Sequence, residues 1–237
     1  DKPWWKRASF RVMTHLFLER RELDVPLKIV PNSPIIQEQL SHYYPEFIGK
    51  LTSPVVPGVM PGAVREARVV PFDGGIIGFV GKEWKRKGLP FAVDIVKELR
   101  LTRPNLKFIV LGPNDTSDAK QLFAGWSGGY ELMGWRNQAR YTDFDVLLHP
   151  ALAEPYGMVV TEAMGARVPV VISDACGAKA QVTAEAGEVL SLDLTAKQWA
   201  QALNRQLVRT DQPPIFTRGW SAVAQESVAI YSELNQI

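Results

Sequence analysis

The chain has 237 residues, of which 46% are hydrophobic and 22% are charged, and its net charge is +2. These values exclude a disordered chain, and so small a charge gives no reason to expect nucleic acid as a partner. No window approaches the roughly 18 apolar residues of a membrane span, and the single cysteine, Cys176, indicates a reducing, cytoplasmic compartment.

Residues 1–60 predict the order helix, strand, helix, strand. Apolar residues three and four positions apart predict an amphipathic helix near the N-terminus. A short strand in "LKIVPNS" precedes a helix that Ser33 caps and Pro34 opens, and a second short strand lies in "KLTSPVVPGV". These elements are too few for a whole α/β domain. Because the chain begins at Asp1 rather than at a methionine, we expect that a preceding part of this domain is missing.

Residues 61–75 are rich in proline and glycine and predict a linker. Short apolar segments then alternate with helical patterns, the clearest of which begins near Leu89. Strands that are apolar on both faces and alternate with helices predict an α/β fold with a doubly wound, parallel, Rossmann-like sheet in residues 76–210. The predicted strands are residues 76–80, 106–111, 130–133, 145–149, 168–173 and 188–192. Residues 211–237 add a last helix.

A basic loop follows the first of these strands. Lys82, Lys85, Arg86 and Lys87 stand between Gly81 and the next predicted helix. Four cations near the positive end of a helix dipole would repel one another unless an anion lies among them, and a diphosphate fits that requirement. An arbitrary loop of this kind is more often a solvated surface feature. The phosphate motifs GxxxxGK[ST] and GxGxxG are both absent.

Two glutamates, Glu154 and Glu162, bracket the start of a helix predicted near Gly157. The free amides of Gly157, Met158 and Val159 would point out of that helix and offer an anion site. Helical side chains tilt toward the N-terminus, so Glu162 would lean toward the same ligand. Two carboxylates around such amides suit a molecule with hydroxyls at both ends and a diphosphate between them. On spacing alone, a ligand site is no more favoured than the alternative, in which Glu154 is a solvated surface residue and Glu162 complements the helix dipole.

Other chemistry-bearing residues favour structural roles. "TDFDV" resembles the DxD metal motif of some sugar-nucleotide enzymes, but Asp145 opens a strand and would lie at the wrong edge of the sheet. His149 and Cys176 lack metal-ligand spacing to partners. The N-terminal "KPWWKR" mixes tryptophan with cations, which is typical of contact with an anionic membrane surface. The same pattern fits the packed edge of an incomplete domain, which we favour slightly.

Several motifs, in this order and spacing, resemble the donor half of retaining GT-B glycosyltransferases of family 4, with lipopolysaccharide core glucosyltransferases the most similar. They are "GFVGKEWKRKG", "KFIVLGPN", "YELMGW", "DVLLHP", "EPYGMVVTEAMGARVPVVISDACG" and "GEVL". The resemblance implies that residues 1–60 end an acceptor-side domain. It also implies that residues 76–210 bind a UDP-, GDP- or ADP-sugar, and that the last helix crosses back to the acceptor-side domain.

The resemblance also implies roles for individual residues. Lys87 matches the lysine at the donor diphosphate, and Lys82 stands where many members carry arginine. Glu154 matches the first glutamate of the E-x7-E motif, at the donor sugar and the reacting face, which makes it the candidate catalytic residue. Glu162 matches the second glutamate, at the ribose. Gly157, Met158 and Val159 match the amides at the diphosphate, and Gly134 and Trp135 fall where the base is contacted. The family needs no metal or other cofactor here.

Nothing in the chain matches the family's acceptor-side catalytic residues. We therefore expect a metal-independent, retaining hexosyltransferase fragment that binds the donor but does not turn over without its missing N-terminal domain. The expected acceptor is a cell-envelope glycan or glycolipid, reached from the cytoplasm or at the inner face of the membrane. The alternative is a noncatalytic nucleotide-sugar-binding or assembly module, which would follow if the native reading frame begins at Asp1. The missing GxGxxG disfavours a nicotinamide-binding fold.

Overall fold

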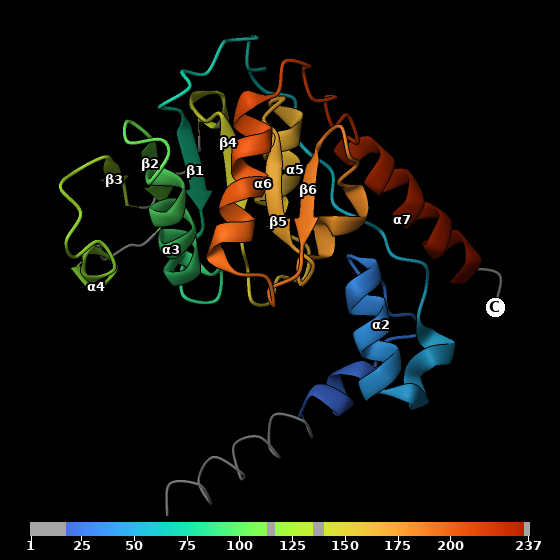
Figure 1. Cartoon of the computed structure of the whole chain (residues 1–237). Helices are drawn as coiled ribbons and strands as arrows, with labels where there is room; N and C mark the ends of the chain where they lie inside the picture. The colour runs from blue at the N-terminus through green and yellow to red at the C-terminus, as the bar shows by residue number, and fades with distance from the viewer. Residues whose placement is uncertain (1–17, 113–116, 135–139, 235–237) are drawn as a thin grey trace, which may run out of the picture. The chain divides into compact units, whose positions relative to one another are not determined.

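The computed structural model describes residues 18–112, 117–134 and 140–234. The chain divides into two compact units (Figure 1). The larger unit spans residues 57–223. The smaller unit belongs to residues 1–56 and 224–237. Each unit is described by itself.

The larger unit is built on a six-stranded sheet in which every neighbouring pair of strands is parallel. The strand order is β3-β2-β1-β4-β5-β6. This order confirms the predicted α/β fold with a doubly wound, Rossmann-like sheet. The strands are β1 (Ile76–Val80), β2 (Lys107–Leu111), β3 (Tyr130–Leu132), β4 (Val146–His149), β5 (Val170–Ser173) and β6 (Gly187–Leu190).

The helices of this unit connect and cover the strands. They are α3 (Leu89–Arg100), α4 (Ser117–Gln121), α5 (Met158–Gly165) and α6 (Ala196–Val208), with 3-10 turns η2 (Tyr141–Asp143) and η3 (Gly177–Gln181). Crossovers between parallel strands are right-handed, and the order reverses between β1 and β4, so α3 and α5 cover opposite faces of the sheet. Helix α6 packs against α3 and covers the strands from β4 to β6 (Figure 1).

The core explains why these segments form these elements. Helix α3 buries Ala92, Ile95, Val96 and Leu99 on one face, as their spacing predicts. In α6, Thr195 and Gln198 form a capping box, and the fully buried Trp199 donates its indole N–H to the carbonyl oxygen of Ser191. Both helices lie over apolar strands with four or more buried positions in β1, β4 and β5.

The smaller unit contains residues 18–24 in a helix, α2 (Pro34–Tyr43), the 3-10 turn η1 (Pro45–Lys50) and the last part of α7 (Trp220–Leu234). Ser33 caps α2 by accepting a hydrogen bond from the amide of Ile36, as predicted. The two strands predicted here were wrong. The described residues form only an isolated parallel bridge between Ile29 and Leu51, because so short a segment has no further strands to pair with.

Candidate functional site

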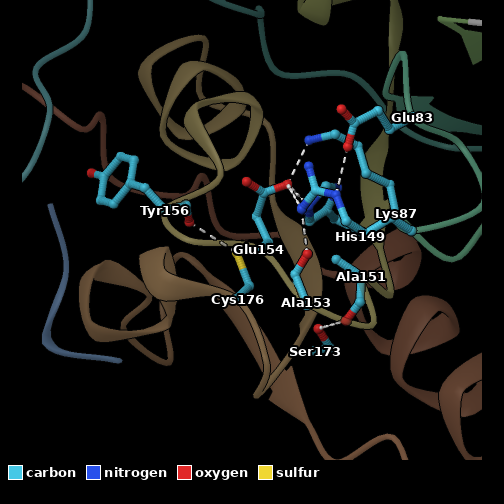
Figure 2. Close-up of polar contacts among 10 residues, drawn as sticks. Glu83, Lys87, His149, Ala151, Ala153, Glu154, Tyr156, Ser173 and Cys176 are labelled. Carbon is cyan, nitrogen blue, oxygen red and sulfur yellow. Dashed lines mark hydrogen bonds and ion pairs between the residues drawn. The ribbon is translucent and has the colours of Figure 1, made fainter. Parts of the chain in front are cut away.

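The strand order reverses between β1 and β4, so the loops after these two strands lie next to each other. Ligands of open α/β sheets bind at such switch points. The loop after β1 carries Lys87 and the loop after β4 carries Glu154, and Lys87 Nζ lies 2.5 Å from Glu154 Oε2 (Figure 2). Two residues 67 positions apart in the sequence therefore meet where the fold class predicts a ligand.

Glycines allow the two loops to approach so closely. Gly88 is the N-cap of α3 with φ 78°, and a Cβ at this position would overlap the carbonyl oxygen of Pro150. Leu152 donates its amide to the carbonyl oxygen of Arg86 at 2.9 Å, which ties the loops together. The stem of Lys87 passes over Gly81, where any side chain would displace it. The basic loop thus aims Lys87 across the switch point.

Glu154 is a buried carboxylate with its backbone fixed on both sides. Its side chain is 9% exposed. Its amide donates to the carbonyl oxygen of Ala175 at 3.2 Å, and its carbonyl oxygen accepts from the amide of Gly177 at 2.9 Å. Burial raises the pKa of Glu154, but its polar neighbours His149 and Lys87 lower it by more, so the pKa falls to about 2. Glu154 is therefore ionised at neutral pH.

His149 ends β4 and lies against the same carboxylate. Its side chain is fully buried, and its Nε2 lies 3.8 Å from Glu154 Oε2. Among the described residues, neither ring nitrogen has a hydrogen-bond partner. Burial is the main cause that lowers the pKa of His149, so the imidazole is neutral. The spacing of this histidine in the sequence disfavours a metal-ligand role and predicts no other.

Helix α5 begins beside Glu154, as the sequence predicts. Gly157 is its N-cap with φ 96°, and as a glycine it has no side chain with which to cap this terminus. A Cβ on Gly157 would lie 2.7 Å from the buried Sγ of Cys176 and 3.2 Å from Cγ of Glu154. The first amides of a helix have no partner within the helix, so those near Met158 and Val159 are placed to hold an anion at the switch point.

Glu162 lies one turn into α5 and contacts Tyr141 in η2. The Tyr141 hydroxyl donates to Glu162 Oε2 at 2.5 Å. Burial and then the charge of Glu162 raise the pKa of Tyr141 well above its ordinary value, so the phenol keeps its proton and donates it. Glu162 and Met158 line a pocket of about 500 Å³ in the larger unit, together with Tyr141, Arg140, Trp220 and the segment 60–63. Glu162 therefore faces a space that a nucleoside could occupy.

The other predicted site residues lie around this centre. Lys82 is exposed in the basic loop. Two other cations of this loop contact groups of the protein. Arg86 donates to Glu83 and to the carbonyl oxygen of Ala153, and Lys85 lies over the Trp84 ring. Gly134 has φ 66° and its carbonyl oxygen accepts from the amide of Gly112 at 2.9 Å. Trp135 lies outside the described residues.

Asp145 lies at the opposite edge of the sheet, as the sequence predicts. It accepts hydrogen bonds from Arg65 at 2.6 Å, from Arg68 at 2.8 Å and from the amide of Ile76 at 2.8 Å. Asp145 therefore connects the segment before β1 to the amino ends of the strands through hydrogen bonds and ion pairs. Within the described residues, no group of three or more His, Cys, Asp or Glu side chains is arranged to hold a metal. No helix among them is long and apolar enough to cross a membrane.

Sequence reasoning missed two residues of this site. His149 stands at the carboxyl end of a predicted strand, and in an open parallel sheet that position by itself points toward the ligand. Tyr141 gave no such signal, because 21 residues separate it from Glu162 and only the packing of η2 on α5 brings them together.

Comparisons with known proteins give the larger unit a family. The model for glycosyl transferases group 1 matches residues 74–208, more than half of the chain. An uncharacterised glycosyltransferase of Methanocaldococcus jannaschii is 25% identical over 191 residues, which are 70% of this chain and 47% of that protein. The chain spans less than half the length of the curated relatives it matches.

Solved structures show the same fold. WaaG, a glycosyltransferase involved in lipopolysaccharide biosynthesis, superposes with a TM-score of 0.65 and 20% identity over 77% of this chain and 54% of WaaG. Anabaena HepE, solved in complex with UDP and glucose, gives a TM-score of 0.66 and 18% identity over 89% of this chain and 64% of HepE. At these identities the likeness concerns the fold, which is that of GT-B glycosyltransferases.

Proposed function

Because the chain belongs to the group 1 glycosyl transferases, we propose that it is the donor-binding part of a GT-B enzyme that moves a hexose from a nucleoside-diphosphate sugar to an acceptor hydroxyl. The observation that carries this proposal is the meeting of Lys87, Glu154 and the start of α5 at the switch point. Glu162 lies one turn further, in a pocket large enough for a nucleoside. HepE, a structural neighbour, was solved with UDP and glucose, which supports a UDP-sugar as the donor.

The charges at the switch point support departure of a diphosphate. Lys87, the exposed Lys82 and the first amides of α5 would stabilise the negative charge that develops on the leaving group. We assign the ribose to Glu162, the diphosphate to the amides of Gly157, Met158 and Val159, and the base to Gly134 and Trp135. This set of ligands requires no metal ion or other cofactor.

The protonation state of Glu154 limits its role. With a pKa of about 2 it has no proton to donate at neutral pH, so it cannot act as a general acid. As a carboxylate it can accept hydrogen bonds from donor-sugar hydroxyls and stabilise positive charge at the anomeric carbon. We propose this role for Glu154 in a transfer that retains the anomeric configuration, as in family 4.

The acceptor and its location are further parts of the proposal. WaaG acts in lipopolysaccharide biosynthesis, which supports a cell-envelope glycan or glycolipid as the acceptor. We propose a cytoplasmic reaction at the inner face of the membrane, with a peripheral contact when the acceptor is a lipid. The acceptor side would come from an N-terminal domain that completes the two-domain enzyme, and residues 1–60 would be the end of that domain.

Calorimetric titration with UDP-glucose and UDP tests the donor site. Lys87→Met removes the ammonium but keeps the stem over Gly81, and Glu162→Ala removes the carboxylate. Hydrogen bonds to charged groups contribute about 1.5–3 kcal/mol, so each variant should weaken UDP binding by at least about tenfold.

Two matched variants control for general charge effects. Lys85→Ala removes a cation of the same loop that lies over Trp84, and Glu185→Ala removes an exposed carboxylate outside the site. Both should bind UDP as the unchanged chain does. Equal affinities in the Lys87 and Glu162 variants and in the controls would refute the site assignment. Transfer of glucose by the two-domain protein would exclude the noncatalytic binding module that the sequence leaves open.

A further inference from the structure

Among the described residues, one cation lies close to the Glu154 carboxylate. Lys87 Nζ lies 2.5 Å from Oε2, whereas Arg86 Nη1 and His149 Nε2 lie at 3.8 Å. Arg86 is already engaged, because its guanidinium donates to Glu83 at 2.6 Å and to the carbonyl oxygen of Ala153 at 2.5 Å. Figure 2 shows Lys87 and His149 beside the Glu154 carboxylate.

Donor binding would disturb this arrangement. Under the proposed function, which this inference rests on, Lys87 turns its charge toward a diphosphate. A buried carboxylate that loses its cation is costly and tends to take up a proton. Glu154, at 9% exposure, would then become a neutral acid at the moment when its negative charge is needed beside the sugar.

His149 has the properties needed to prevent protonation of Glu154. Its imidazole is fully buried, and among the described residues both ring nitrogens lack hydrogen-bond partners, which is expensive unless a partner arrives. A movement of less than about 1 Å would bring Nε2 within hydrogen-bond distance of Glu154. A neutral imidazole supplies an N–H without adding a positive charge that would compete for the diphosphate.

We propose that His149 is a positioning residue whose neutral Nε2–H donates a hydrogen bond to the Glu154 carboxylate when Lys87 moves to the donor diphosphate. This hydrogen bond keeps the carboxylate ionised and oriented toward the sugar. The charged and titratable groups around this exchange are Lys87 and Arg86 from the loop after β1, Glu83 on Arg86, and the Cys176 thiol beyond β5. Burial raises the pKa of that thiol to about 12, so Cys176 stays uncharged.

Proton uptake on binding UDP-glucose tests this role. UDP-glucose has no group that titrates near neutral pH, so any proton taken up goes to the protein. Calorimetry near pH 6.5 in two buffers of different ionisation enthalpy measures that uptake. His149→Leu fills the site without a donor, and His149→Gln keeps an N–H near the position of Nε2. Thermal unfolding establishes that both variants are folded.

The unchanged chain and His149→Gln should bind UDP-glucose without proton uptake. His149→Leu should bind several-fold more weakly and take up a substantial fraction of one proton, and its affinity should rise as the pH falls from about 8 to about 6. Equal proton uptake in the Leu and Gln variants would overturn the inference, as would uptake by the unchanged chain that His149→Leu abolishes. Failure of the unchanged chain to bind UDP-glucose would refute the proposed function and the inference together.

Discussion

Glu154 is the residue on which burial, charge and position act together. Most carboxylates with so little exposure would have a raised pKa, because the charged form loses its hydration. Here the polar neighbours His149 and Lys87 lower the pKa by more than burial raises it, so the direction of the shift is reversed. The ion pair between Lys87 and Glu154 stabilises the fold, and it also places a cation and an anion where a donor would bind.

The stability of the chain should therefore depend on pH through Glu154. Its pKa is about 2 in the folded chain and 4.5 ordinarily, so the folded state binds fewer protons. The stabilisation is complete above about pH 4.5 and is lost as the pH falls toward about 2. Urea unfolding at several pH values should show a gap between the unchanged chain and Glu154→Gln that narrows over this window. A gap that stays constant down to about pH 3 would contradict the ionised Glu154.

Tyr141 should matter to nucleotide binding through Glu162 alone. Tyr141→Phe removes the hydroxyl that donates to Glu162 at 2.5 Å, so the carboxylate loses its orientation. A net loss of about 1 kcal/mol corresponds to roughly fivefold weaker UDP binding. Tyr130→Phe is the control, because Tyr130 stacks on Phe123 within the core cluster. UDP affinities that are the same in both variants would mean that Tyr141 does not position Glu162.

At the scale of elements, both loops at the switch point depend on glycines with positive φ. Gly88 begins α3 and Gly157 begins α5, and each is an N-cap in the left-handed region. The sequence predicted all six strands of the larger sheet, within two residues at each end, because apolar runs bounded by loops are a strong local signal. It could not predict which atoms the loops bring together, since those contacts depend on how two distant turns pack.

A double-mutant cycle measures the packing at the start of α5. Gly157→Ala places a methyl group 2.7 Å from the Sγ of Cys176 and forces alanine to φ 96°, which should cost about 2 kcal/mol in the free energy of unfolding. Cys176→Ala removes the Sγ, so the double variant should recover part of that cost. Chemical denaturation of the unchanged chain, the two single variants and the double variant gives the coupling free energy between positions 157 and 176. Additive effects would indicate that backbone strain alone, rather than the contact with Cys176, sets the cost.

At the scale of the whole molecule, the two units differ in how far the sequence could describe them. The larger unit contains a complete sheet, so its periodicity predicted the fold, and the order of its motifs predicted the glycosyltransferase family. In the described residues of the smaller unit, helical segments are accompanied by one isolated β-bridge, so its two predicted strands had too few neighbours to form. The boundaries drawn at residues 60, 75 and 210 stay predictions.

Asp145 should be the strongest single tie between the segment before β1 and the sheet. Asp145→Asn keeps an acceptor for the Ile76 amide but removes the charge opposite Arg65, whose side chain is only 12% exposed. Breaking such a buried pair costs about 3–5 kcal/mol, whereas removing an exposed partner costs less than about 1 kcal/mol. Arg68 is 40% exposed, so Arg68→Ala is the matched control on the same carboxylate. Urea unfolding should thus show a much larger loss for Asp145→Asn than for Arg68→Ala. Losses of equal size would mean that Arg65 finds water or another acceptor in the variant, and that the amino edge of the sheet does not depend on this aspartate to hold the preceding segment.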